Sequence, residues 1–254
     1  ALDGVSLPAA YEVDEPVRLL AEHLTARARR SVLLVGPPGC GKTAIFHEVV
    51  RRRRTFGLEQ TRFWETSGAR LVAGASGFGM WQERVDRICR EAAREKAVLH
   101  LGNLVELLEV GSSEAQQESV GSFLRPRLSR GELLAVAECT SEQLGVVERR
   151  DPALLRSFEQ LRVEEPDGAT TALVLMHVAG NRKPAVPAEA IEEVVALHRR
   201  WAAGSACPGQ PLRFLRNALR DLGGPRAVTV EAVREAFTRS TGLPAFLVDR
   251  RKPF

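Results

Sequence analysis

Short apolar runs alternate with longer stretches of helical spacing over the first two thirds of the chain. The run at residues 31–35 is apolar after its first residue and is closed by Gly36 and Pro37, which is typical of a buried strand. Further strands are expected at residues 62–66, 97–101, 133–137 and 161–163. Helices are expected over residues 42–54, 81–96 and 113–129. This alternation predicts an α/β fold in which a parallel sheet is covered by helices on both faces.

Two helix starts can be located from local sequence. Ser113 has Gln116 three residues later, the spacing of a capping box, so we expect the helix over residues 113–129 to begin there. Asp151 precedes Pro152, which is typical of an N-cap followed by proline at the first helical position.

After Pro166 only helical spacing is found. It predicts helices over residues 187–201, 212–219 and 230–237, the last with Thr229 as its N-cap. We therefore expect two domains: a large α/β nucleotide-binding domain over residues 1–166, and a small helical lid domain with a C-terminal linker over residues 167–254.

The segment between the first expected strand and the next helix matches the phosphate-binding pattern G-x-x-x-x-G-K-[ST]. Its residues are Gly36, Pro37, Pro38, Gly39, Cys40, Gly41, Lys42 and Thr43, and we include Ala44, the next residue, in the expected binding site. Glycine lets the backbone curl until several N–H groups point at phosphate oxygens, and the helix N-terminus adds partial positive charge. Lys42 is expected at the β- and γ-phosphates, and the Thr43 hydroxyl at Mg²⁺. The sequence therefore predicts binding of ATP or ADP with Mg²⁺.

Composition narrows the class of protein. Apolar residues make up 44% and charged residues 27%, close to average usage in globular chains, and no apolar run approaches the roughly 18 residues of a membrane helix. Much of the net charge of +4 comes from residues 51–54 and 250–252, so it does not by itself indicate nucleic acid. The four cysteines lack C-x-x-C spacing, which favours a reducing, cytoplasmic compartment over a disulfide scaffold or a zinc site.

Five further segments follow the phosphate loop in order. They are Leu71–Ala75 with Glu83-Arg84, Gly121–Pro126 with Arg130–Leu133, Asp151–Leu154 with Arg156 and Phe158, Glu165-Pro166, and Ser240–Pro244. Together with the loop, and over nearly the whole chain, they resemble the first ATPase module of the Clp/ClpB unfoldase and disaggregase family of AAA+ proteins. The resemblance implies an AAA+ P-loop domain followed by a small all-helical domain, ATP hydrolysis, and assembly into a ring that we expect to be a hexamer.

The departures from the family's pattern fall on the hydrolysis site. The second nucleotide motif of the family is an apolar strand that ends in Asp-Glu, whereas this chain has Gly102 and Asn103. The resemblance implies that the carboxylate for Mg²⁺ and the carboxylate that polarises the attacking water are both missing. Asparagine can hydrogen-bond a water but cannot accept its proton, and such assistance is worth roughly 10²–10⁴ in rate. His100, inside the same strand, is interpreted as a core or interface histidine.

Other family positions also differ. The sensor-1 polar residue falls at Cys139, a weak hydrogen-bond donor, and Thr140 is a substitute shifted by one residue. Of the family's arginine-finger pair only Arg156 is present, with Ser157 in the second position, and the resemblance implies that Arg156 acts in trans on a neighbour's nucleotide.

Three functions are compatible with these residues. The leading hypothesis is an ATP- or ADP-binding module with weak or no hydrolysis that acts in nucleotide-dependent ring assembly or regulation. A second AAA+ module, expected C-terminal to Phe254, would then do the work. The alternative is an active unfoldase or disaggregase module with a displaced catalytic acid, for which Glu106 and Glu109 are candidates, although surface positions on the next helix are the simpler interpretation. A polypeptide substrate would then meet Phe78, for which core or subunit packing is equally open. The third hypothesis is an interaction module with a vestigial nucleotide site.

Overall fold

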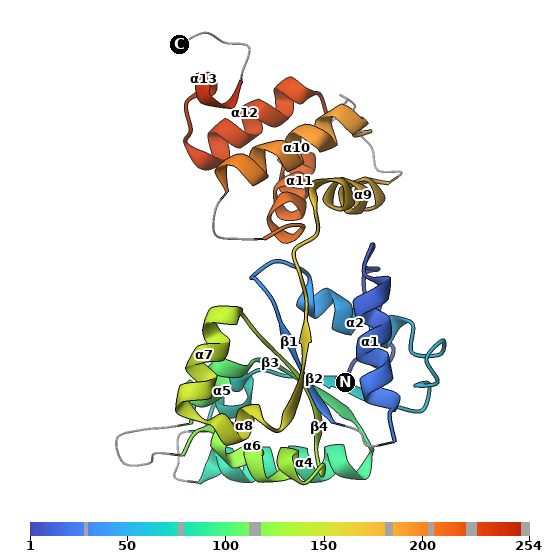
Figure 1. Cartoon of the computed structure of the whole chain (residues 1–254), viewed down its shortest axis with the longest axis vertical. Helices are drawn as coiled ribbons and strands as arrows, with labels where there is room; N and C mark the ends of the chain where they lie inside the picture. Colours follow the sequence, from blue (N-terminus) through green and yellow to red (C-terminus); the bar gives the residue numbers. More distant parts are fainter. Residues whose placement is uncertain are drawn as a thin grey trace. The chain divides into compact units, whose positions relative to one another are not determined.

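The computed structural model describes residues 1–27, 30–75, 79–111, 118–180, 185–202, 206–221 and 228–249 of the chain (Figure 1). The chain divides into two compact units. The first comprises Ala1–Gly36 and Lys42–Val163, and the second comprises Pro37–Gly41 and Glu164–Phe254. No helix of the described residues is long and apolar enough to cross a bilayer.

The first unit is built on a parallel sheet with the strand order β2-β3-β4-β1-β5, in which the described residues form five strands (Figure 1). The strands are β1 (Ser31–Val35), β2 (Phe63–Glu65), β3 (Val98–Asn103), β4 (Leu134–Cys139) and β5 (Phe158–Arg162). Strand β1 pairs with β4 on one side and β5 on the other, and all its residues are buried, as expected for a central parallel strand covered on both faces. The predicted α/β fold class is confirmed.

Helices cover both faces of this sheet. On one face, α1 (Asp14–Thr25) and α2 (Lys42–Arg51) pack against each other and against the sheet, α1 on β1 and β5 and α2 on β4 (Figure 1). The helices of the other face are α3 (Gly68–Val72), α4 (Met80–Arg94), α5 (Leu104–Glu109), α6 (Val120–Ser129), α7 (Ser141–Arg150) and α8 (Pro152–Leu155).

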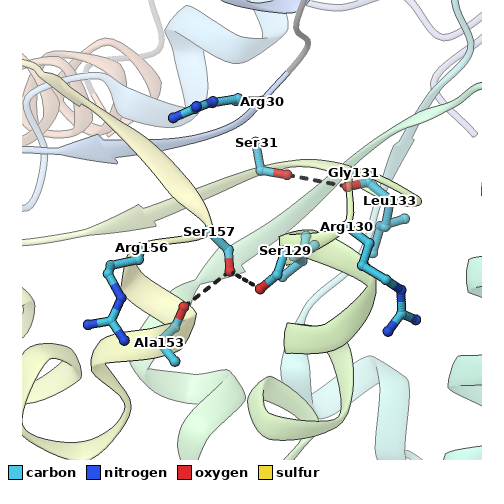
Figure 2. Close-up of a pocket in the computed structure, with 10 residues that line it drawn as sticks. Arg30, Ser31, Ser129, Arg130, Gly131, Leu133, Ala153, Arg156 and Ser157 are labelled. Carbon is cyan, nitrogen blue, oxygen red and sulfur yellow. Dashed lines mark hydrogen bonds between the residues drawn. The ribbon is translucent and has the colours of Figure 1, made fainter.

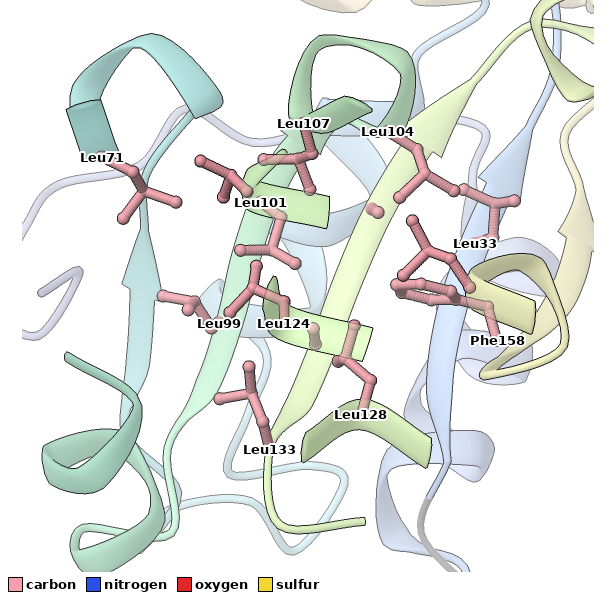
Figure 3. Close-up of a cluster of buried hydrophobic side chains, with 14 of the residues drawn as sticks. Leu33, Leu71, Leu99, Leu101, Leu104, Leu107, Leu124, Leu128, Leu133 and Phe158 are labelled. Atoms are coloured by element: carbon pink, nitrogen blue, oxygen red, sulfur yellow. The ribbon is translucent and has the colours of Figure 1, made fainter. Parts of the chain in front are cut away.

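The pleat of the central strands determines which side chains meet which helices. Leu99 and Leu101 of β3 and Ala137 of β4 belong to the hydrophobic core that lies under helices α3 to α8, part of which Figure 3 shows. Because successive side chains of a strand point to opposite faces, the alternate residues His100 and Glu138 point toward α2. This alternation places the His100 and Glu138 side chains on the α2 side of the sheet.

Some helix starts follow the local signals. The Asp151 carboxylate accepts a hydrogen bond from the N–H of Leu154 at 2.9 Å and starts α8, as predicted. Of the helix expected over residues 113–129, the structure describes α6, which begins at Val120 with Ser119 as its N-cap. Ser113 and Gln116 themselves lie outside the described residues. The Ser119 hydroxyl accepts a hydrogen bond from the N–H of Ser122 at 3.2 Å, as expected of a serine at an N-cap.

The second unit contains helices and no strand among its described residues. Its helices are α9 (Gly168–Ala179), α10 (Ala188–Trp201), α11 (Gly209–Asp221), α12 (Val230–Thr241) and α13 (Ala245–Val248). The Thr229 hydroxyl caps α12 at the N–H of Ala232, as predicted. Helix α9 was not predicted because it is apolar on all sides: Leu173 and Met176 are exposed while Leu175 is buried, so no helical period can be read.

Candidate nucleotide-binding site

The predicted phosphate loop connects β1 to α2. Gly39 and Gly41 have φ angles of +94° and +102°, a left-handed region that glycine adopts without the steric cost other residues incur. A Cβ atom at Gly41 would meet no atom within 4 Å. The backbone therefore borders open space on this side, which fits a loop that receives a ligand.

Backbone hydrogen bonds hold the middle of the loop within the second unit. The N–H of Ala206 donates to the carbonyl of Pro38 at 2.8 Å, and the N–H of Gly209 donates to the carbonyl of Gly39 at 3.0 Å. A Cβ at Gly209 would lie 2.8 Å from that same oxygen, so glycine is required there by the close approach. Cys40, inside the loop, is buried.

Lys42 and Thr43 open helix α2. The Lys42 side chain is buried, and its Nζ donates to the carbonyl oxygen of Gly36 at 2.7 Å, which holds the ammonium over the start of the loop. Thr43 and Ala44 are exposed. The Thr43 hydroxyl donates to Glu138 Oε1 at 2.7 Å.

Strand β4 thus brings a carboxylate to Thr43 that the sequence analysis did not single out. Glu138 Oε1 also lies 2.9 Å from His100 Nε2, and the Glu138 side chain is only 14% exposed. Burial alone would raise the pKa of Glu138. The hydrogen bond and charge of His100, the Thr43 hydrogen bond and the Lys42 charge outweigh burial and hold the pKa below its usual value. The available signal was a single charged residue at the carboxyl end of an otherwise apolar strand.

His100 connects this carboxylate to a row of ionisable side chains. Its ring is buried and stacks on Phe46 of α2, with centroids 4.5 Å apart and an interplanar angle of 15°. Its Nδ1 has no hydrogen-bond partner among the described residues and lies 3.9 Å from Glu65 Oε1, while Glu65 Oε2 lies 3.0 Å from His47 Nε2. Interpreting His100 as a core histidine agrees with its burial, but the sequence did not indicate its acidic partner.

The end of β3 starts a helix. Gly102 has a φ angle of +69°, and the pairing of β3 with β4 shifts register between His100 and Asn103. The Asn103 Oδ1 accepts a hydrogen bond from the N–H of Val105 at 2.8 Å, and its Nδ2 donates to Gln143 Oε1 at 3.2 Å. Asn103 is therefore the N-cap of α5, and both ends of its amide are engaged.

The predicted sensor-1 residues are engaged elsewhere too. Cys139 is 1% exposed and belongs to the core on the face opposite Glu138, and burial raises the pKa of its thiol to about 11. Thr140 forms a capping box with Gln143 at the start of α7. Its hydroxyl accepts from the Gln143 N–H at 3.2 Å, and Gln143 Oε1 accepts from the Thr140 N–H at 2.9 Å.

The structure also locates the two candidates for a displaced acid. Glu106 Oε1 accepts a hydrogen bond from the N–H of Ala69 at 2.6 Å, and Glu109 is exposed with its Oε1 3.9 Å from Arg150 Nη1. Phe78, the candidate for polypeptide contact, and Gly77 beside it lie outside the described residues.

Arg156 lies at the end of the sheet where the parallel strands begin, whereas the loop follows the end where β1 finishes. It is the C-cap of α8 and is followed two residues later by the first residue of β5, so it belongs to the edge formed by the amino ends of the parallel strands. Figure 2 shows it at a cavity of about 520 Å³ that is also lined by Arg30 and Arg130.

The three arginines of this cavity differ in their partners. Arg30 pairs with Glu159 at 2.7 Å, and Arg130 pairs with Glu132 at 2.5 Å. The Arg156 residue is exposed, and its guanidinium makes no ion pair with the side chains that the structure describes. Ser157, which stands where the family has a second arginine, is hydrogen-bonded to Ser129 at 2.8 Å (Figure 2).

ClpB chaperones are among the curated proteins that this chain is similar to. The chaperone protein ClpB of Vibrio cholerae is 30% identical over 168 residues, which cover 64% of this chain and 20% of that protein. The chaperone protein ClpB of Bacteroides thetaiotaomicron is 26% identical over 219 residues, which cover 82% of this chain and 25% of that protein. The chain therefore spans a fifth to a quarter of the length of these relatives.

Solved structures share the fold. The S. cerevisiae Hsp104–ADP complex superposes with a TM-score of 0.83 at 23% identity, over 97% of this chain and 44% of that chain. The extended conformation of the S. cerevisiae Hsp104–casein complex gives a TM-score of 0.81 at 23% identity, over 94% of this chain and 43% of that chain. The model of the ATPase family associated with various cellular activities (AAA) matches residues 32–165, more than half of the chain. The chain therefore belongs to the AAA family, as a Clp/ClpB-type AAA+ ATPase module.

Proposed function

We propose that this module binds ATP or ADP with Mg²⁺ through residues 36–43, hydrolyses ATP slowly or not at all, and uses nucleotide occupancy to control assembly into a ring. The observation that carries the proposal is the contrast between a complete phosphate loop and the end of β3, where Asn103 is engaged as a helix cap.

The loop residues fit a nucleotide. The left-handed glycines leave open space beside Gly41, and the buried Lys42 ammonium lies at the start of the loop. Mg²⁺, held by the Thr43 hydroxyl, would neutralise charge on the phosphates. Glycine backbone, lysine and hydroxyl together are the donors that a nucleoside di- or triphosphate requires.

We expect slow hydrolysis because the expected residues at the neighbouring strand ends supply no base for the attacking water. The Asn103 amide cannot accept a proton, and its oxygen already accepts the N–H of Val105. The Cys139 thiol is buried in the core on the other face of the sheet. Neither residue supplies a base, so we expect the rate to fall by the roughly 10²–10⁴ that such a base contributes.

Ring assembly is supported by the location of Arg156. It lies before the amino end of β5, whereas the loop follows the carboxyl end of the adjacent β1, and five residues of strand span about 16 Å. This distance separates Arg156 from the loop of its own chain and supports the proposal that it acts on a partner molecule. The partner would be a further copy, in a ring we propose to be hexameric, or a second AAA+ module.

The alternative function is an active unfoldase or disaggregase module with a displaced acid. One observation favours it, namely that the Glu138 carboxylate hydrogen-bonds Thr43. The Hsp104 structure with casein makes a polypeptide the corresponding substrate to test.

Nucleotide binding and turnover separate these functions. ADP with Mg²⁺ at about 100 times its Kd should stabilise the chain by roughly 2.7 kcal/mol, and Lys42→Ala should abolish the thermal shift. Steady-state ATP turnover of the unmodified chain should be at or only slightly above that of Lys42→Ala. Turnover at a rate typical of the family that Lys42→Ala abolishes would instead establish the active alternative. The absence of a thermal shift with ATP and with ADP would indicate a vestigial site.

Assembly is tested separately by sedimentation velocity with and without ADP. The unmodified chain should form larger species when nucleotide is present, and Arg156→Ala should weaken this response while leaving nucleotide affinity unchanged. Arg150→Ala, another exposed arginine in the same unit, is the matched control. Equal sedimentation in all conditions would exclude nucleotide-dependent assembly of this chain.

A further inference from the structure

The proposed function assigns no role to the carboxylate of Glu138 on strand β4. Given that the loop binds a nucleotide, as proposed above, we propose that Glu138 is a ligand of the Mg²⁺ that accompanies the nucleotide, directly or through a water. Glu138 would thereby replace, from β4, the carboxylate that is missing at the end of β3.

The strand register places Glu138 at the centre of the site. It pairs with Leu34 of β1, two residues before the loop begins, and with Asn103 of β3 on its other side. It is therefore level with the position at which an acid was expected, one strand away. Neighbouring strands are about 4.8 Å apart, a distance that a glutamate side chain largely spans.

The contact with Thr43 carries the inference. In P-loop proteins the hydroxyl of the loop and a carboxylate hold Mg²⁺ together. Thr43 Oγ1 and Glu138 Oε1 lie 2.7 Å apart, close to the separation of about 2.9 Å between adjacent oxygen ligands of octahedral Mg²⁺. The two oxygens can therefore belong to one coordination shell with only a small adjustment.

His100 holds the carboxylate in place from behind. Its Nε2 lies 2.9 Å from the same Oε1 atom, and its buried ring is fixed by stacking on Phe46. Carboxylates that bind metals are commonly oriented by such a second hydrogen bond. His100 is thus a positioning residue in this proposal.

Glu106, the other acid near the end of β3, is less suited to the task. Its Oε1 accepts the Ala69 N–H at 2.6 Å, and its Cγ would lie only 3.1 Å from a Cβ at Gly68, so the side chain is packed against α3. Releasing it toward the loop would leave the N–H of Ala69 without this partner.

The test compares the effect of Mg²⁺ on ADP affinity, measured by isothermal titration calorimetry in Mg²⁺ and in EDTA. Mg²⁺ should raise the affinity of the unmodified chain, and Glu138→Gln should remove roughly tenfold or more of that gain. In EDTA the Glu138→Gln variant should bind ADP as well as the unmodified chain or better, because a negative charge near the phosphates is gone. Glu142→Gln, the same change at an exposed residue of α7, should behave as the unmodified chain.

The outcomes separate the two proposals. A full Mg²⁺ gain in Glu138→Gln, or an unmodified chain that binds ADP without any Mg²⁺ gain, would overturn the role of Glu138 and leave a buried Glu–His pair that is only structural. Failure of the unmodified chain to bind ADP in either condition would overturn the proposed function itself.

A second measurement does not depend on any variant. Fe²⁺ replaces Mg²⁺ in the complex of the unmodified chain with ADP, and hydrogen peroxide with ascorbate is added. The peroxide oxidises Fe²⁺ and forms hydroxyl radical, which cleaves the backbone close to the metal, and ascorbate reduces the iron again. Cleavage near residues 43 and 138 would support the proposal, whereas cleavage near residue 106 without cleavage near 138 would overturn it.

Discussion

The ends of β3 and β4 pair with each other in the sheet, yet they are built for different tasks. At the end of β3, the left-handed Gly102 leads into Asn103, whose side chain starts a helix. At the end of β4, Glu138 stays in the strand and points its carboxylate at Thr43, while the next residue, Cys139, faces the core. The comparison teaches that an acid missing from one strand of a site is not evidence that the site has no acid.

The two strand ends also differ in what a substitution would disturb. Glu138 is held by two hydrogen bonds within a partly buried row of ionisable groups, so changes there act through charge and packing. Changes at Gly102 and Asn103 act through backbone conformation and helix capping.

The largest effect is expected from His100→Ala. The change removes a buried ring that stacks on Phe46 and one hydrogen bond of a buried carboxylate, so the free energy of unfolding should fall by about 3 kcal/mol. Urea denaturation followed by tryptophan fluorescence measures it. His47→Ala is the control, since that ring is 20% exposed and should cost less than about 1 kcal/mol. Equal losses in both variants would mean that the end of β4 is no more tightly held than its surroundings.

Restoring acids at the end of β3 should cost stability. A Cβ at Gly102 would lie 3.6 Å from the Thr66 carbonyl oxygen, so there is room, but the left-handed backbone costs a side chain about 1 kcal/mol. Replacing the Asn103 cap costs about another 1 kcal/mol. The double variant Gly102→Asp, Asn103→Glu should thus lose about 2 kcal/mol in urea denaturation. Unchanged stability would show that the strand end accepts acids freely.

Removing the helix cap at the end of β3 or of β4 should lower the free energy of unfolding by the same amount, and by less than the two changes above. Asn103→Ala and Thr140→Ala should each cost about 1 kcal/mol, because each leaves a backbone N–H at a helix start without its partner. Asn103→Asp keeps an acceptor oxygen and should cost much less. Both caps contact Gln143, so the double alanine variant should depart from additivity by about 0.5 kcal/mol. Strict additivity would contradict the shared contact.

The smallest effect concerns Cys139 and needs no substitution. Because its thiol is buried and its pKa is raised to about 11, iodoacetamide at pH 8 should label it only when the chain unfolds. Mass spectrometry of labelled peptides, with the urea-unfolded chain as control, gives the rate. Rapid labelling of the folded chain would mean that Cys139 and not Glu138 faces the loop.

Much of the fold could be predicted because its signals are local. The strand over residues 31–35 was placed correctly at both ends, and helices α2 and α4 were found at their expected positions. Helix α9 was missed because an element that is apolar on all sides has no readable period. The predicted start at Ser113 lies outside the described residues, and the described helix α6 begins at Val120.

The candidate site divides in the same way. The phosphate loop, with Lys42 and Thr43, could be recognised because its pattern is contiguous. Glu138 could not be recognised, because its partner Thr43 is 95 residues away and the local sequence of neither segment indicates that the two side chains meet. Asn103 and Thr140 were interpreted through the chemistry their positions imply in the family, whereas the structure engages both as N-caps.

The amino-acid sequence by itself therefore determined the loop, the alternation of strands and helices, and the absence of acids at the end of β3. Only the tertiary structure decided which acid lies beside Thr43. Strand order brings β4 between β1 and β3, and the pleat turns Glu138 rather than Cys139 toward α2. Both depend on which strands pair, a choice made by burial of the whole sheet and not by any one segment.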